Sequence, residues 1–183
     1  MHILLLGLAV FVVSHVLPMT GAKPALKQRL GDRGYGAVFG VLSLVSLGLI
    51  VWGYSQTEYI GLYEPPMWGH HVTIFCVFAA ILVLVSVLVP SHLRHWISNP
   101  LAVGFLLWAI GHLFANGDVA SVVMFGTFAA YCIVSLLVRP APEVSSKIDV
   151  SLSGDVIAVA VAAVIFFIVF AAHPYIIGVH ILP

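Results

Sequence analysis

Residues 100–138 read PLAVGFLLWAIGHLFANGDVASVVMFGTFAAYCIVSLLV. Two apolar runs, 100–114 and 119–138, flank Asn116-Gly117-Asp118, a sequence typical of a tight turn between helices. A helix needs about 20 apolar residues, with a rise of about 1.5 Å each, to cross the bilayer core. This stretch therefore predicts two antiparallel membrane helices joined by a short turn.

The rest of the chain repeats the pattern of apolar runs. Four more such runs cover residues 3–19, 38–54, 71–90 and 156–172. The chain is 62% hydrophobic and only 8% charged, whereas a soluble domain is about a quarter charged. We therefore expect an all-α, polytopic transmembrane bundle of about six spans, forming a single domain over residues 1–183.

The basic residues predict how the chain is oriented. All seven lie in the first, third and fifth loops between the runs: Lys23, Lys27, Arg29, Arg33, Arg94, Arg139 and Lys147. The second loop carries only Glu58 and Glu64, and the fourth carries only Asp118. Because cytoplasmic loops are enriched in Lys and Arg, the basic loops are expected in the cytoplasm and both termini in the periplasm.

Several functional classes are disfavoured by the sequence. Seven acids balance the seven basic residues, so the chain has no basic footprint for nucleic acid. No acid lies deep in a predicted span, which argues against an ion pump built on buried carboxylates. Cys76 and Cys132 lie inside apolar runs and are far apart in the sequence, so we interpret both as packing residues.

Histidine is the one abundant residue with chemistry, at nine in 183 residues. His15 and His112 fall within predicted spans, and His71 opens the third. A polar ring in hydrocarbon needs a partner, which is either a hydrogen bond to a neighbouring helix or a bound metal or haem. His112 shares a stripe with Leu101, Phe105 and Trp108, a pattern that on its own is more typical of helix packing than of a cofactor site.

Three motifs resemble the NnrU family of bacterial inner-membrane proteins. They are LGDRGY at 30–35, PPMWGHH at 65–71, and LWAIGHL at 107–113 followed by ANGDVAS at 115–121. The resemblance runs from about residue 3 to residue 138. The family name implies a link to nitrite and nitric oxide metabolism.

The NnrU family is also similar to the plant zeta-carotene isomerase, a haem b membrane enzyme that isomerises a cis double bond. The haem-ligating histidines of that enzyme resemble His15 and His112, and a further family histidine matches His71. The resemblance thus implies haem b as a cofactor, bound by two of these three residues. The sequence departs from the family at Ser98-Asn99-Pro100, where Arg-His-Pro is usual.

Depth in the membrane limits which histidines pair. Two axial imidazoles on one iron place their nitrogens roughly 4 Å apart. His112 lies about 6 Å below the outer turn, whereas His15 lies near the inner edge if the first helix ends at Met19. His15 would reach mid-membrane only if that helix continued past Pro18. The second ligand therefore stays open between His15, which the family favours, and His71, which depth favours.

These observations lead to three functional hypotheses. The first is a haem b protein with redox or isomerase-like activity on a lipid-soluble substrate that enters from the bilayer. The second is a non-catalytic accessory protein that helps assemble a respiratory, denitrifying complex. The third, a small carrier, is disfavoured because the chain lacks an inverted repeat.

Overall fold

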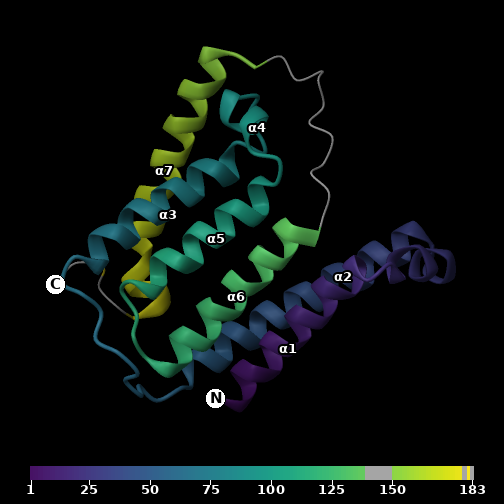
Figure 1. The fold of residues 1–183 in the computed structure, drawn as a ribbon, viewed down its shortest axis with the longest axis horizontal. Coiled ribbons are helices and arrows are strands. Elements are labelled where there is room, and N and C mark those ends of the chain that lie inside the picture. The colour runs from purple at the N-terminus through teal and green to yellow at the C-terminus, as the bar shows by residue number, and fades with distance from the viewer. Residues whose placement is uncertain (139–149, 179–180, 182–183) are drawn as a thin grey trace.

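The computed structural model describes residues 1–138, 150–178 and 181, and this part of the chain is helical throughout its regular elements (Figure 1). The elements are α1 (His2–Val16), the 3-10 turn η1 (Leu17–Met19), α2 (Ala22–Ser55), α3 (Gly69–Val85), α4 (His92–Trp96), α5 (Pro100–Leu113), α6 (Val119–Val138) and α7 (Leu152–Ile177). Within the described residues the one β pairing is an isolated bridge between Gly61 and Asp118. The predicted all-α fold is confirmed.

Four helical segments are long and apolar enough to cross a membrane. They are His2–Met19, Ala22–Ser55, Val119–Val138 and Leu152–Tyr175. Two shorter apolar helices, α3 and α5, lie beside them. The chain is therefore a membrane protein by the length and composition of its helices.

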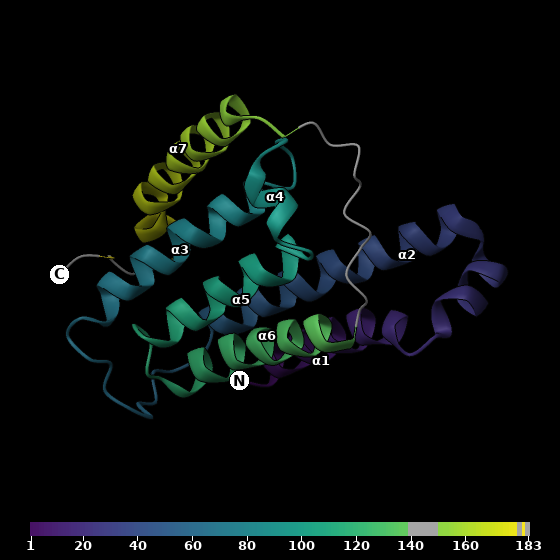
Figure 2. The same ribbon diagram turned by 45° about the horizontal axis from the view of Figure 1, so that its top comes forward.

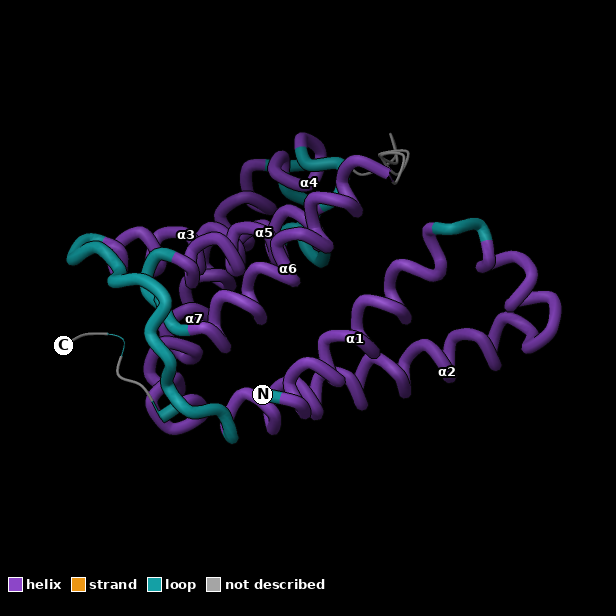
Figure 3. The backbone as a smooth tube through the Cα atoms, turned by 60° about the horizontal axis from the view of Figure 1, so that its bottom comes forward, coloured by secondary structure: helices purple, strands orange, loops and turns teal. Residues whose placement is uncertain are grey.

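The helices lie side by side in the order α7, α3, α5 and α6, followed by α1 and α2. Helix α5 lies between α3 and α6, and α7 packs on α3 (Figure 2). Helices α1 and α2 form a long hairpin that rests against α6. The end of this hairpin at η1 projects away from the other helices (Figure 3).

Glycines permit the closest of these contacts. A Cβ at Gly7 of α1 would lie 2.7 Å from the backbone nitrogen of Ile50 in α2, and one at Gly53 would collide with the backbone of Leu4. Between α3 and α5, a Cβ at Gly111 would lie 2.6 Å from Cβ of Cys76. Small residues thus bring helix backbones together, as is usual in membrane bundles.

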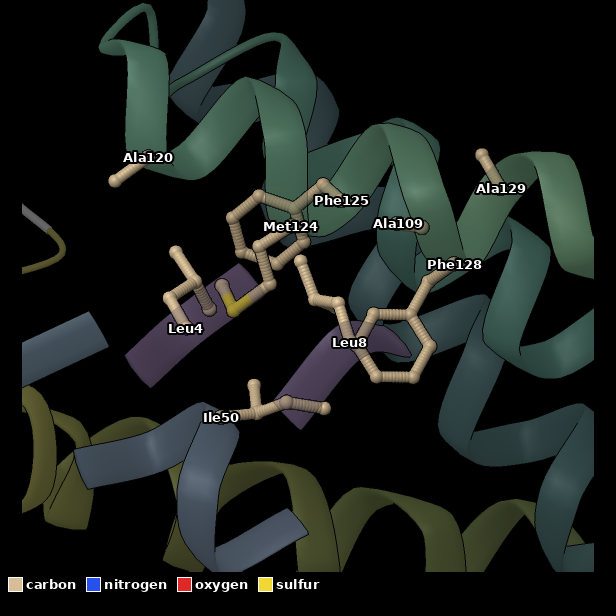
Figure 4. Packing of buried hydrophobic residues seen from close by; sticks show 9 residues of the cluster. All are labelled: Leu4, Leu8, Ile50, Ala109, Ala120, Met124, Phe125, Phe128 and Ala129. Carbon is tan, nitrogen blue, oxygen red and sulfur yellow. The ribbon is translucent and has the colours of Figure 1, made fainter. Parts of the chain in front are cut away.

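A hydrophobic core joins the α1–α2 hairpin to α5 and α6 (Figure 4). Its buried members are Leu4, Leu8, Ile50, Ala109, Ala120, Met124, Phe125, Phe128 and Ala129. Three of these are large side chains of α6 that reach toward α1. The aromatic residues of the candidate site pack against this core.

The first apolar segment lies at His2–Met19, close to the predicted 3–19, and it does not continue past Pro18 in the way that would bring His15 to mid-membrane. Two other helices differ from the predicted spans. Helix α2 begins at Ala22 rather than Val38, because Gly21 turns the chain with φ 81° and the basic stretch after it is helical. Helix α3 ends at Val85 rather than Pro90, since turns follow it and proline has no N–H to continue a helix. The predicted fifth loop falls largely outside the described residues.

Candidate functional site

His112 lies half-buried near the C-terminal end of α5, among aromatic rings of its own helix and of α6. Its Nδ1 lies 2.8 Å from the carbonyl oxygen of Trp108, one turn earlier. A carbonyl only accepts, so Nδ1–H donates and the lone pair of the neutral ring lies on Nε2. The ring stacks on Phe125 at 4.6 Å and lies 5.1 Å from the indole of Trp108. These contacts fix both the orientation of the imidazole and its tautomer.

His15, in the last turn of α1, makes the same kind of contact with the backbone carbonyl one turn earlier. Its Nδ1 lies 2.9 Å from the carbonyl oxygen of Phe11, and the hydroxyl of Ser14 lies 3.0 Å from the same nitrogen. The ring stacks on Phe11 at 4.2 Å and meets Phe39 of α2 at 5.0 Å and Tyr131 of α6 at 5.7 Å. His15 is therefore also held in the tautomer with the proton on Nδ1, and three aromatic rings surround it.

The two imidazoles do not meet in this structure. His15 is level with Tyr131 and His112 with Phe125, and these positions on α6 are separated by about 9 Å along the helix. A shared iron needs ligand nitrogens roughly 4 Å apart.

Aromatic rings fill the space between the two histidines. Phe128 of α6 lies 5.5 Å from Trp108 on one side and 4.7 Å from Phe11 on the other. Each histidine touches one end of this series of rings. The separation follows from the end of α1, which turns at η1 and leaves His15 in the last turn of α1, next to η1.

His71 lies on the far side of α3 from His112. Helix α3 meets α5 through Gly69 and Thr73, whose hydroxyl donates to the carbonyl oxygen of Gly111 at 2.7 Å. His71 follows Gly69 by two residues, which is about 200° around the helix, and it is exposed. The structure therefore does not bring His71 and His112 together.

The Asn-Gly-Asp turn and the 56–68 loop cover the C-terminal end of α5, next to His112. Asn116 Nδ2 donates to the carbonyl oxygen of His112 at 2.8 Å. Tyr63 of the 56–68 loop donates its hydroxyl to the carbonyls of Leu113 and Asn116, and its N–H donates to that of Gly117 at 3.0 Å. Sequence reasoning identified the turn but not this cover, since the loop carries no periodic pattern.

Asp118 extends the same network into the bundle. The carboxylate is buried and caps α6 by accepting from the N–H of Ser121 at 3.0 Å. The hydroxyls of Ser121 and Tyr54 lie 2.8 Å apart, which links α6 to α2. Asp118 was expected only as a loop acid. A capping Asp before an apolar run was the available signal.

The opposite end of the bundle has a separate polar contact. Asp155 at the start of α7 accepts from the N–H of His92 at 2.8 Å and from its Nδ1 at 2.7 Å. This pair fastens α4 to α7. It is far from His112 in the fold, and its geometry is that of a structural link between helix ends.

The donor chemistry of this region suits haem iron only in part. His112 presents Nε2 as a lone-pair donor among flat apolar rings, which fits one axial position of a haem. Neither His15 nor His71 lies where it would complete a two-histidine set with His112. Within residues 1–138 and 150–178, no three His, Cys, Asp or Glu side chains gather as a metal site.

The apolar helices, the close glycine contacts and the histidine held between helices define an integral membrane helical bundle. The chain belongs to the NnrU protein family, whose profile matches residues 3–181. The match extends the resemblance from residues 3–138, which end with α6, to α7. Neither a curated protein nor a solved structure matches this chain.

Proposed function

We propose that this chain is a six-span protein of the bacterial inner membrane, with both termini in the periplasm. Four segments qualify as spans by length, and α3 and α5 supply the other two as shorter helices held between them. The end of α7 and the start of α6 lie toward the same end of the bundle as the 56–68 loop (Figure 1). The basic residues lie in the loops assigned to the cytoplasm.

We further propose that the protein binds haem b through His112. The observation that carries this is the Nδ1–H bond from His112 to Trp108, which leaves Nε2 as the ligating atom. Phe125 and Trp108 hold the ring in an apolar, aromatic setting that favours a flat cofactor. The resemblance to the plant zeta-carotene isomerase supports the cofactor, because it implies a haem-ligating histidine at position 112.

The second axial position is open in this proposal. His15 has the right tautomer, and α1 would have to shift along α6 to approach His112. His71 would need a rotation of α3. The alternative is that His112 alone would hold the haem.

Bound haem would supply a Lewis acid or a one-electron centre within the bilayer. The substrate class that fits is a lipid-soluble molecule, since the site lies between apolar helices. The link to nitrite and nitric oxide metabolism rests on the family name. Without haem, the accessory role in a respiratory complex becomes the leading hypothesis.

The test is an oxidised-minus-reduced absorption spectrum of the detergent-purified protein, expressed with ample haem. We expect a Soret band in the wild type and its loss in His112→Ala. The variants His15→Ala and His71→Ala report on the second ligand, because only the residue that ligates would alter the band positions. His95→Ala is the matched control, since His95 is exposed on α4. A wild-type protein without a Soret band would rule out the haem proposal.

A further inference from the structure

The first third of α2 forms a distinct element at the tip of the α1–α2 hairpin. The chain turns at Gly21, runs as helix from Ala22, and is broken at Gly31, whose φ of 72° and ψ of 164° are not helical. Figure 3 shows this segment at the hairpin end farthest from the other helices. We call residues 22–33 the basic elbow.

Helix α2 is too long for the membrane alone. A straight helix of 34 residues would be about 51 Å long, against a hydrocarbon core of about 30 Å. The residues from Tyr35 to Ser55 suffice to cross that core. The basic elbow therefore lies at the headgroup level, just beyond the end of the span.

The basic elbow concentrates positive charge. It holds four of the seven basic residues of the chain: Lys23, Lys27, Arg29 and Arg33. The one acid is Asp32, which pairs with Lys27 at 2.7 Å, with side-chain exposures of 82% and 41%. Four positive charges less one negative charge leave a net charge of +3 on twelve residues. None of the three other basic side chains has a described acidic partner.

The basic elbow also has an apolar stripe beside the charged one. Leu26 and Leu30 are four residues apart and share a face, as do Lys23 and Lys27 on the adjacent face. Tyr35 stacks on Phe39 at 6.3 Å where α2 leaves the elbow. An aromatic ring at this depth and lysines flanking an apolar stripe are typical of a helix seated at the membrane interface.

We propose that the basic elbow binds the phosphate headgroups of anionic phospholipids in the adjoining leaflet. The positive charge of the elbow complements the negative phosphates. Its apolar stripe inserts into the bilayer surface and so holds the basic side chains at the depth of the headgroups. Each basic residue close to an anionic membrane favours binding by a factor of up to about five. The contact would fix the outlying end of the hairpin, which few other helices touch, and it does not depend on haem.

The experiment is native mass spectrometry of the full chain from detergent with equal phosphatidylglycerol and phosphatidylcholine. We expect preferential retention of phosphatidylglycerol by the wild type. The preference should fall at least five-fold in a variant with all four basic residues of the elbow changed to Gln. A double variant that keeps the charge, Lys23→Arg with Lys27→Arg, is the control and should bind as the wild type does.

Asp32→Asn supplies a test in the opposite direction. It removes the only acid of the elbow and frees Lys27, so the preference for phosphatidylglycerol should rise. This variant decides the question even if the quadruple variant does not fold, which circular dichroism would report. Retention independent of headgroup charge in the wild type, or no increase in Asp32→Asn, would overturn the proposal.

Discussion

At the residue scale, the main result is the state in which the fold holds His112. When the ring is neutral, a histidine that donates its Nδ1–H to the carbonyl one turn earlier carries its lone pair on Nε2. The sequence predicted that His112 needed a partner but not which one. The backbone carbonyl of Trp108 is that partner. This hydrogen bond is compatible both with a purely structural histidine and with a haem ligand. It satisfies one ring nitrogen and leaves the other suited to iron.

The sequence could not predict which histidines come together. That depends on helix rotation and depth, which a local pattern does not carry. His15 is kept at the end of α1 by a turn at Leu17–Met19, and His71 is turned away from α5 by its place on α3. The departure at Ser98-Asn99-Pro100 has a local role, because Asn99 caps α5 by accepting from the N–H of Ala102 at 3.2 Å.

The cover over His112 gives a prediction for Gly117→Ala. A Cβ at this position would collide with the carbonyl oxygen of Tyr63, so the 56–68 loop would have to lift. We expect a loss of about 1–3 kcal/mol in the free energy of unfolding, measured by thermal denaturation in detergent. The matched control is Gly126→Ala in α6, where a Cβ meets nothing within 4 Å. Equal stability of the two variants would contradict the described cover.

Tyr63 gives a prediction for pH. Burial, and then the charge of Asp118, raise the pKa of the Tyr63 phenol above its ordinary value of 10.0. Its folded pKa therefore exceeds the unfolded one. The stability from its hydroxyl is fully present below pH 10 and is lost as the pH rises through the folded value. Hydrogen exchange at residues 56–68 should accelerate in that range, whereas Tyr63→Phe should exchange faster already at pH 7.

At the scale of elements, the sequence predicted best where signals are local. The hairpin of α5 and α6 was expected at 100–114 and 119–138 and lies at Pro100–Leu113 and Val119–Val138. Proline at the first turn, the Asn-Gly-Asp turn and two apolar runs fix it. The basic elbow was expected to be a loop because its charges break the apolar run. Charge marks where a helix leaves the hydrocarbon, not where it ends.

The α1–α2 hairpin provides a prediction about helix packing. Gly7→Leu would drive a side chain into the backbone of Ile50 and should separate the two helices. We expect a lower melting temperature and weaker resistance to protease. Gly48→Leu on α2 is the control, because a Cβ there meets nothing within 4 Å. Similar behaviour of the two variants would contradict the packing of α1 on α2.

At the scale of the whole molecule, composition sufficed to place the chain in a membrane. The fold adds that the bundle has two parts, the α1–α2 hairpin and the group of α3, α5, α6 and α7, joined through the α6 core. Both histidines with a fixed tautomer face this junction. A ligand held there would contact both parts, so it would also stabilise their association.

The orientation of the bundle predicts which loops a periplasmic reagent reaches. In a background with Cys76 and Cys132 changed to Ala, a cysteine at Glu58 should react with a membrane-impermeant maleimide in intact cells. A cysteine at Lys23 should react only after the cells are permeabilised. The reverse pattern would invert the proposed topology and leave the fold unchanged.

The most direct test of the central claim, haem ligation by His112, is chemical rescue. In His112→Gly the helix remains but the ligand is lost, so the Soret band should disappear. Imidazole in the buffer should enter the vacated space beside Phe125 and Trp108 and restore the band toward its wild-type position. A Soret band that survives unchanged in His112→Gly without imidazole would show that His112 does not hold the iron.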